Sequence, residues 1–129
     1  MYIGCPFGGP IAMVSDERKR SQLQQMEDIS FMRIYTSSAK LISSFRWKHR
    51  GLIKLGWSEE EHLVVVLEDA KVIVYDIHGK QLRYFSMGQE CEDAHIADAY
   101  IWSTGVVVRT AGLYLSYHQS HAILSLHSI

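Results

Sequence analysis

Seven histidines and a run of three glutamates are the residues of this chain whose types could support chemistry. His118 and His121 have the HxxH spacing of a metal site, and His127 follows them. Zinc would need these rings on one face, with further groups orienting each ring, and an irregular C-terminal tail does not supply that arrangement. Glu59–Glu61 fall in a polar turn whose neighbouring side chains diverge, which favours a solvated turn over an acid–base pair. We expect no metal site and no pair of catalytic carboxylates.

Motifs that bind cofactors or activate nucleophiles are missing from the sequence. GxSxG, HExxH, GxxxxGKS/T and GxGxxG do not occur, and Gly8-Gly9-Pro10 lacks the lysine and the helix start of a phosphate loop. Cys5 and Cys91 form neither a CxxC pair nor a dense disulfide framework, which indicates reduced, inert thiols. The sequence therefore predicts a protein that is not an enzyme, with no catalytic residue, no cofactor-binding residue and no cofactor.

Composition and charge are those of a globular domain. The chain has 129 residues, 47% of them hydrophobic, and lacks an apolar run of the roughly 18 residues that a membrane helix needs. Its start lacks the basic region of a signal peptide, so we expect a cytoplasmic protein. The net charge of −1 gives no global field to hold nucleic acid, and none is predicted as a partner. The basic clusters Arg18–Arg20 and Arg46, Lys48 and Arg50 are expected to be solvated loop charges.

An internal repeat predicts the elements that hold these residues in place. Val64–Tyr75 reads VVVLEDAKVIVY and Val106–Tyr117 reads VVVRTAGLYLSY, an offset of 106 − 64 = 42 residues. A Trp-Ser pair precedes each copy, Trp57-Ser58 and Trp102-Ser103. A repeat of roughly 40–45 residues built from short strands is typical of a propeller blade.

Short apolar runs separated by turns define three successive units, at about 1–48, 49–92 and 93–129, in one partial propeller domain over 1–129. The second unit is a meander of four predicted strands: Leu52–Trp57, His62–Leu67, Val72–Ile77 and Gln81–Met87. The third has three predicted strands and a weak fourth: Ile96–Trp102, Val106–Thr110, Leu113–Tyr117 and Ile123–Leu126. The first has one or two strands in its opening segment and then a hairpin: Tyr2–Val14, Phe31–Tyr35 and Lys40–Trp47.

The segment between those parts of the first unit, residues 15–28, is expected to be an inserted, exposed loop, with a helix as the alternative. The predicted fold class is all-β, with antiparallel four-stranded meander sheets that form two to three blades of an incomplete WD-like β-propeller. Closed propellers have about 4–8 blades, so the chain is either a fragment of a longer propeller or completes itself by association. Trp47, Trp57 and Trp102 each end a predicted strand and are expected to pack between blades.

Several short motifs carry a family resemblance when they are taken in order. They are CPFGGPIA at Cys5–Ala12, LGWS at Leu55–Ser58, Val74-Tyr75, Ile77–Gly79 and FSMG at Phe85–Gly88. Over about residues 5–117 this series resembles the N-terminal propeller of the vacuolar protein sorting-associated protein 16 family. The resemblance implies a β-propeller that is followed in the family by an α-solenoid, and a subunit of the HOPS and CORVET tethering complexes.

The same resemblance implies partners and a location. The partners would be other tethering-complex subunits, acting with SNAREs and Rab GTPases in endosome-to-vacuole or lysosome transport. The site for a Sec1/Munc18-type partner is expected to lie in the solenoid, outside this chain. The protein would be cytoplasmic and peripheral on endosome and vacuole or lysosome membranes, only through the complex. Two features depart from the family pattern. Met1 stands almost at the GGPIA motif, whereas family members usually have a further stretch before it. The sequence after Tyr117 no longer follows the pattern, which suggests an altered or splice-derived tail.

Two functions of different classes remain open from the sequence. The first is a non-enzymatic scaffold fragment that contacts other subunits of a tethering complex. The alternative is a generic WD-like peptide-binding module that self-associates to complete its propeller, by strand-edge or top-face recognition. A metal-dependent enzyme that uses the histidine-rich tail is a third, weaker hypothesis.

Overall fold

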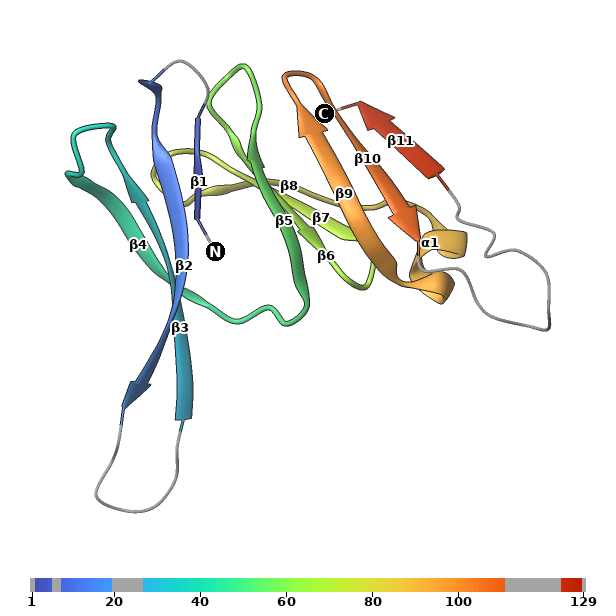
Figure 1. Ribbon diagram of the computed structural model, residues 1–129, viewed down its shortest axis with the longest axis horizontal. Helices are drawn as coiled ribbons and strands as arrows, with labels where there is room; N and C mark the ends of the chain where they lie inside the picture. The colour runs from blue at the N-terminus through green and yellow to red at the C-terminus, as the bar shows by residue number, and fades with distance from the viewer. Residues whose placement is uncertain (1, 6–7, 20–26, 111–123, 129) are drawn as a thin grey trace.

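The computed structural model describes residues 2–5, 8–19, 27–110 and 124–128, which form three antiparallel sheets in chain order. Figure 1 shows the sheets side by side, with strand β5 between β1 and β9. Strands account for most of the described residues, with one short helix among them. The prediction of an all-β fold with four-stranded meander sheets is confirmed.

The first sheet contains a hairpin that is longer than the sequence suggested. Its strands, β1 (Tyr2–Gly4), β2 (Ile11–Lys19), β3 (Glu27–Tyr35) and β4 (Leu41–Trp47), follow in that order. Strand β4 pairs with β3 only from Ser30 onward, whereas β2 and β3 continue together to Lys19 opposite Glu27. The two strands therefore project beyond the sheet as a ribbon (Figure 1).

The expected loop over 15–28 is wrong at both of its ends, because 15–19 and 27–28 belong to β2 and β3. The polar composition misled the prediction. Cross-strand hydrogen bonds pair the facing backbone groups of a two-stranded ribbon and do not depend on an apolar pattern in its sequence. The remaining part of that segment, 20–26, lies outside the described residues.

The second sheet is the meander that the sequence predicts. Its strands are β5 (Leu52–Trp57), β6 (Leu63–Leu67), β7 (Lys71–Tyr75) and β8 (Gln81–Ser86), in that order. Every residue of β6 is buried, as expected of an unbroken apolar run. Strand β7 ends at Tyr75 rather than Ile77, because the Asp76 carboxylate accepts hydrogen bonds from the backbone N–H groups of His78 and Lys80 at 2.9 Å and starts the turn there.

The third sheet has the order β11-β10-β9, with β9 at Ile96–Trp102, β10 at Gly105–Thr110 and β11 at Leu124–Ser128. The weak strand predicted near Ile123–Leu126 was expected to be fourth in its sheet. Instead β11 pairs directly with β10, the place that β7 has in the second sheet. The predicted strand Leu113–Tyr117 lies outside the described residues. Helix α1 (Gln89–Ala94) precedes β9 and was not expected, because QECEDA is polar and only Cys91 is buried.

The apolar core forms two layers, one on each side of the second sheet. The first layer joins Leu55, Trp57, Leu63, Val65, Ile73 and Tyr75 to the first sheet. The second layer joins Val64, Val66, Val72 and Val74 to residues of the third sheet and α1. Successive residues of a strand point to opposite faces, so this sheet supplies side chains to both layers.

The two layers also show a limit of the 42-residue repeat. It aligns strands of the second and third sheets correctly, but the aligned side chains point to opposite faces. Leu63 of β6 points toward the first sheet, and Val106 of β10 points toward the second. Their pairings agree, since Leu63 lies opposite Trp57 and Val106 lies opposite Ile101. The structural counterparts are therefore 106 − 63 = 43 residues apart. A slip of one residue moves each side chain to the other face of the sheet. The slip accompanies a shorter turn: residues 58–62 join β5 to β6, whereas only 103–104 join β9 to β10.

We expect Leu63→Ala to lower the free energy of unfolding by about 2–5 kcal/mol, because Leu63 is fully buried between the first two sheets. Leu82→Ala removes the same atoms from a side chain that is 40% exposed. This variant should change the free energy of unfolding by less than about 1 kcal/mol. Urea unfolding followed by circular dichroism measures both. Equal losses in the two variants would contradict the assigned core.

Candidate functional site

The histidines of the C-terminal segment cannot be assembled into a site from the structure. His118 and His121 lie outside the described residues. The backbone of His127 lies on β11, opposite Val106. In the part of the chain that the structure describes, no group of three or more His, Cys, Asp or Glu residues is arranged to hold a metal ion.

The three glutamates of the turn after β5 face different neighbours. The Glu60 carboxylate lies 3.6 Å from Nδ1 of His62, whereas Oε1 of Glu61 lies near Gly9 of the first sheet. The backbone N–H of Glu59 donates a 2.9 Å hydrogen bond to the carbonyl oxygen of Ser103, on the third sheet. This turn therefore links neighbouring sheets, and its carboxylates do not converge on one point.

The environment of Cys5 keeps its sulfur in the thiol form. Burial raises the pKa of Cys5, and the negative charge of Glu61 raises it further. A nucleophilic cysteine needs the opposite, a pKa lowered by positive charge. Cys91 is buried in the second core layer, and both cysteines are free thiols. Cys5 therefore lacks the surroundings of a catalytic thiolate.

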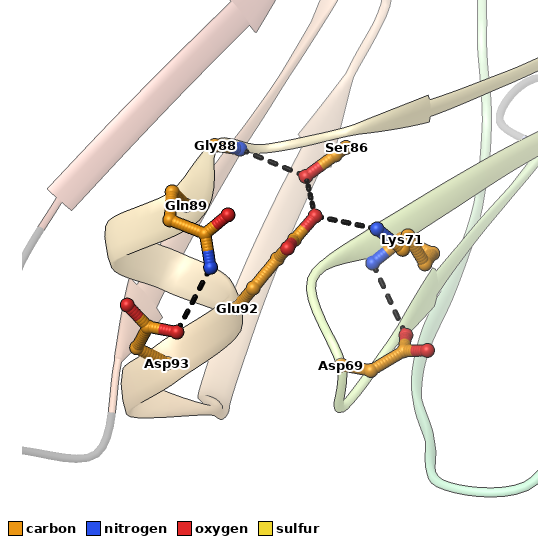
Figure 2. Close-up of polar contacts among 7 residues, drawn as sticks. All are labelled: Asp69, Lys71, Ser86, Gly88, Gln89, Glu92 and Asp93. Carbon is orange, nitrogen blue, oxygen red and sulfur yellow. Dashed lines mark hydrogen bonds and ion pairs between the residues drawn. The ribbon is translucent and has the colours of Figure 1, made fainter.

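A polar cluster attaches helix α1 to the second sheet, as Figure 2 shows. The Glu92 carboxylate accepts hydrogen bonds from Nζ of Lys71 and from Oγ of Ser86. The hydrogen bond from Lys71 lowers the pKa of Glu92 most, and the bond from Ser86 lowers it further. The same contact with Glu92 raises the pKa of Lys71. The ion pair positions α1 so that Cys91 fills the core between the second and third sheets.

Two of the three tryptophans contact a neighbouring sheet, as the sequence predicts. Nε1 of Trp57 donates a 3.1 Å hydrogen bond to the carbonyl oxygen of Ile3 in β1. Trp47 of the first sheet meets Tyr75 of the second edge-on, with ring centroids 6.3 Å apart. These contacts tie the first sheet to the second at strand ends.

Trp102 does not follow that prediction. Its ring stacks on Tyr100 of the same strand, with centroids 6.2 Å apart, and lies against Gly105, its partner at the start of β10. Ile101, between the two rings in sequence, packs toward Gly56 of the second sheet. Because residues of a strand alternate, Tyr100 and Trp102 point away from the second sheet. The one-residue slip described above is the cause.

Tyr100, Trp102 and Val107 together form what we call the open face of the third sheet. Tyr100 is 64% exposed, and Trp102 and Val107 are partly exposed. The equivalent face of the second sheet, with Val64 and Val66, is covered by the third sheet. Exposed aromatic side chains at such a position are a frequent mark of protein contact, so the open face is the candidate interaction surface.

The fold and this surface define the class of protein, which is an all-β, propeller-like protein whose sheets stack face to face. Residues 1–124 match the family model described as "Vps16, N-terminal region", and the chain belongs to this family. This confirms the resemblance that the motifs carry. Among the described residues, no helix is long and apolar enough to cross a membrane.

Similar curated proteins come from distant eukaryotes. The vacuolar protein sorting-associated protein 16 homolog of Dictyostelium discoideum is 34% identical over 110 residues, which is 84% of this chain. Protein VACUOLELESS1 of Arabidopsis thaliana is 37% identical over 109 residues, or 82% of this chain. The Drosophila melanogaster homolog is 31% identical over 109 residues, or 81%. The chain spans about 13% of the length of each of these relatives.

Trp57→Phe should lower the free energy of unfolding by about 1–3 kcal/mol, because the hydrogen bond to Ile3 is lost and the smaller ring leaves part of the buried indole site unfilled. Trp102→Phe is the matched control and should have the smaller effect, since it does not contact the second sheet. Thermal and urea unfolding measure both variants. A larger effect at Trp102 would contradict the assigned roles.

The contribution of Glu92 to stability should depend on pH. Its folded-state pKa is lowered, so its stabilising contribution is present above the unfolded-state pKa, about 4.3, and is lost as the pH falls through the folded value. We expect Glu92→Gln to destabilise the chain at pH 7 and to approach the parent stability as the pH falls below the folded-state pKa of Glu92. Glu90→Gln, on the exposed side of α1, is the control. A difference that is constant with pH would refute the ion pair's role.

Proposed function

We propose that this chain is a segment of a vacuolar protein sorting subunit and acts as a non-enzymatic scaffold. The observation that carries the proposal is the match of residues 1–124 to the Vps16 N-terminal region. The geometry adds support, because the second sheet uses both faces for packing and the third leaves Tyr100, Trp102 and Val107 open. A protein built from such faces works by holding other protein surfaces.

The finer parts of the proposal concern partners and location. The partners are other subunits of the HOPS and CORVET tethering complexes, and the open face is the surface that contacts protein. A Sec1/Munc18-type partner is assigned to the solenoid of longer family members rather than to this chain. The site of action is the cytoplasmic side of endosome and vacuole or lysosome membranes, reached through the complex, in vesicle-mediated transport.

Affinity purification of the tagged chain from its native cells tests this function. We expect other tethering subunits to co-purify, and the double variant Tyr100→Ala/Trp102→Ala to lose at least about tenfold of them, as expected when two interface aromatic anchors are removed. Leu41→Ala/Tyr84→Ala removes exposed side chains of β4 and β8 and should leave the yield unchanged. The absence of tethering subunits from both native extract and reconstitution would refute the proposal, and equal loss in both double variants would refute the role of the open face.

The second candidate is a WD-like peptide-binding module that self-associates. The observation that favours it is a hollow of about 270 Å³ between the second and third sheets, lined by Ser58, Glu60, His62, Leu82, Arg83 and Thr104 among others. Apolar and charged groups of both signs meet there, as in a site for a peptide. Size-exclusion chromatography with light scattering separates the candidates, because a folded, strict monomer would exclude ring completion by self-association.

A further inference from the structure

A different surface, far from the open face in sequence, gathers positive charge where the chain passes from β4 to β5. Arg46 lies near the end of β4, and Lys48, His49 and Arg50 follow Trp47 in the connection. All four basic side chains are exposed. Together with Ser30 and Trp47 they line a hollow of about 650 Å³. We call this hollow the basic corner.

The charge of the basic corner is not neutralised by neighbours in the described part of the chain. Arg46, Lys48 and Arg50 have no carboxylate within 4.0 Å there. Like charges held this close repel one another, so a bound anion would relieve the repulsion.

Trp47 supplies an independent reason to expect a ligand. Its ring is 93% buried, since only 7% of its surface is exposed. Nε1 has no hydrogen-bond partner among the described residues. A buried donor that is left unpaired costs about 1–3 kcal/mol, and such donors are usually satisfied by a polar group or by ordered water. The ring borders the basic corner and meets His49 edge-on, with centroids 5.0 Å apart.

The lining decides which kind of anion fits. Apart from the Trp47 ring, the lining side chains among the described residues are all basic or hydroxyl-bearing. The hollow lacks the aliphatic contacts that would anchor a peptide among these residues. Guanidinium groups bind phosphate oxygens through two parallel hydrogen bonds, and Lys adds a compact charge. Three permanent charges beside one hollow suit more than one phosphate group.

We propose that the basic corner binds the phosphate groups of a small polyphosphorylated ligand, of the chemistry shared by inositol phosphates and phosphoinositide headgroups. Arg46 and Arg50 grip phosphate oxygens, Lys48 neutralises the remaining charge, and Ser30 borders the same space. The binding needs no bond making or breaking. It is separate from the contact with protein partners at the open face.

Titration of the 129-residue chain with inositol hexakisphosphate, followed by calorimetry, tests this site directly. We expect saturable binding that weakens as salt increases. Arg46→Ala/Arg50→Ala should weaken it at least about tenfold, because two charge-assisted contacts are lost. Lys40→Ala/Lys80→Ala removes the same number of charges from exposed positions elsewhere and should leave binding nearly unchanged. Circular dichroism of each variant shows that the fold is retained.

Two further measurements, with the soluble ligand and with vesicles, identify the source of the phosphate groups. Binding both to the soluble ligand and to vesicles that contain a phosphoinositide identifies a lipid headgroup, whereas binding to the soluble ligand alone identifies a soluble phosphate. Either result supports the site. Absence of saturable binding, or equal weakening in both double variants, would overturn it. Tighter binding of polyglutamate or of an RNA oligonucleotide would also overturn it, in favour of another class of partner.

Discussion

The coverage of the second sheet is the constraint on which the rest of the structure depends. A sheet whose two faces are both apolar is stable in water only when a layer packs on each side. Strand β6 is buried along its whole length, with alternate residues in the layers toward the first and third sheets. The sheets therefore stack in sequence, and each added sheet presents a new face to be covered.

Polar contacts adjust this stacking rather than create it. The indole of Trp57 reaches the backbone of β1, the turn after β5 reaches Ser103, and the ion pair of Lys71 with Glu92 holds α1 at the edge of the second layer. Each is a single contact at the rim of an apolar layer. Gly56 also adjusts the stacking, because it lets the second and third sheets approach closely. A Cβ at this position would lie 2.7 Å from Ile101.

Much of the fold follows from the sequence, because local patterns suffice for it. Short β-branched runs and turn residues located nearly all of the described strands, and the hairpins between consecutive strands require only local pairing. The extension of β2 and β3 over 15–19 and 27–28 was missed because the residues there are all polar and give no alternating apolar pattern. Helix α1 was missed because its one buried residue, Cys91, gives no helical period. The basic corner was read as loop charge, since nothing in the sequence places Ser30 beside Arg46 and Trp47.

By itself the sequence determined the class of fold and the family, since both depend on which residue types occur and in what order. The tertiary structure alone decided which face each strand presents. The Trp-Ser pair that precedes each copy of the repeat suggests that Trp57 and Trp102 correspond, yet the pairing gives Ile101 the place of Trp57, a shift of one residue. Because the side chains of a strand alternate, that shift turned Trp102 and Tyr100 away from the core and made the open face.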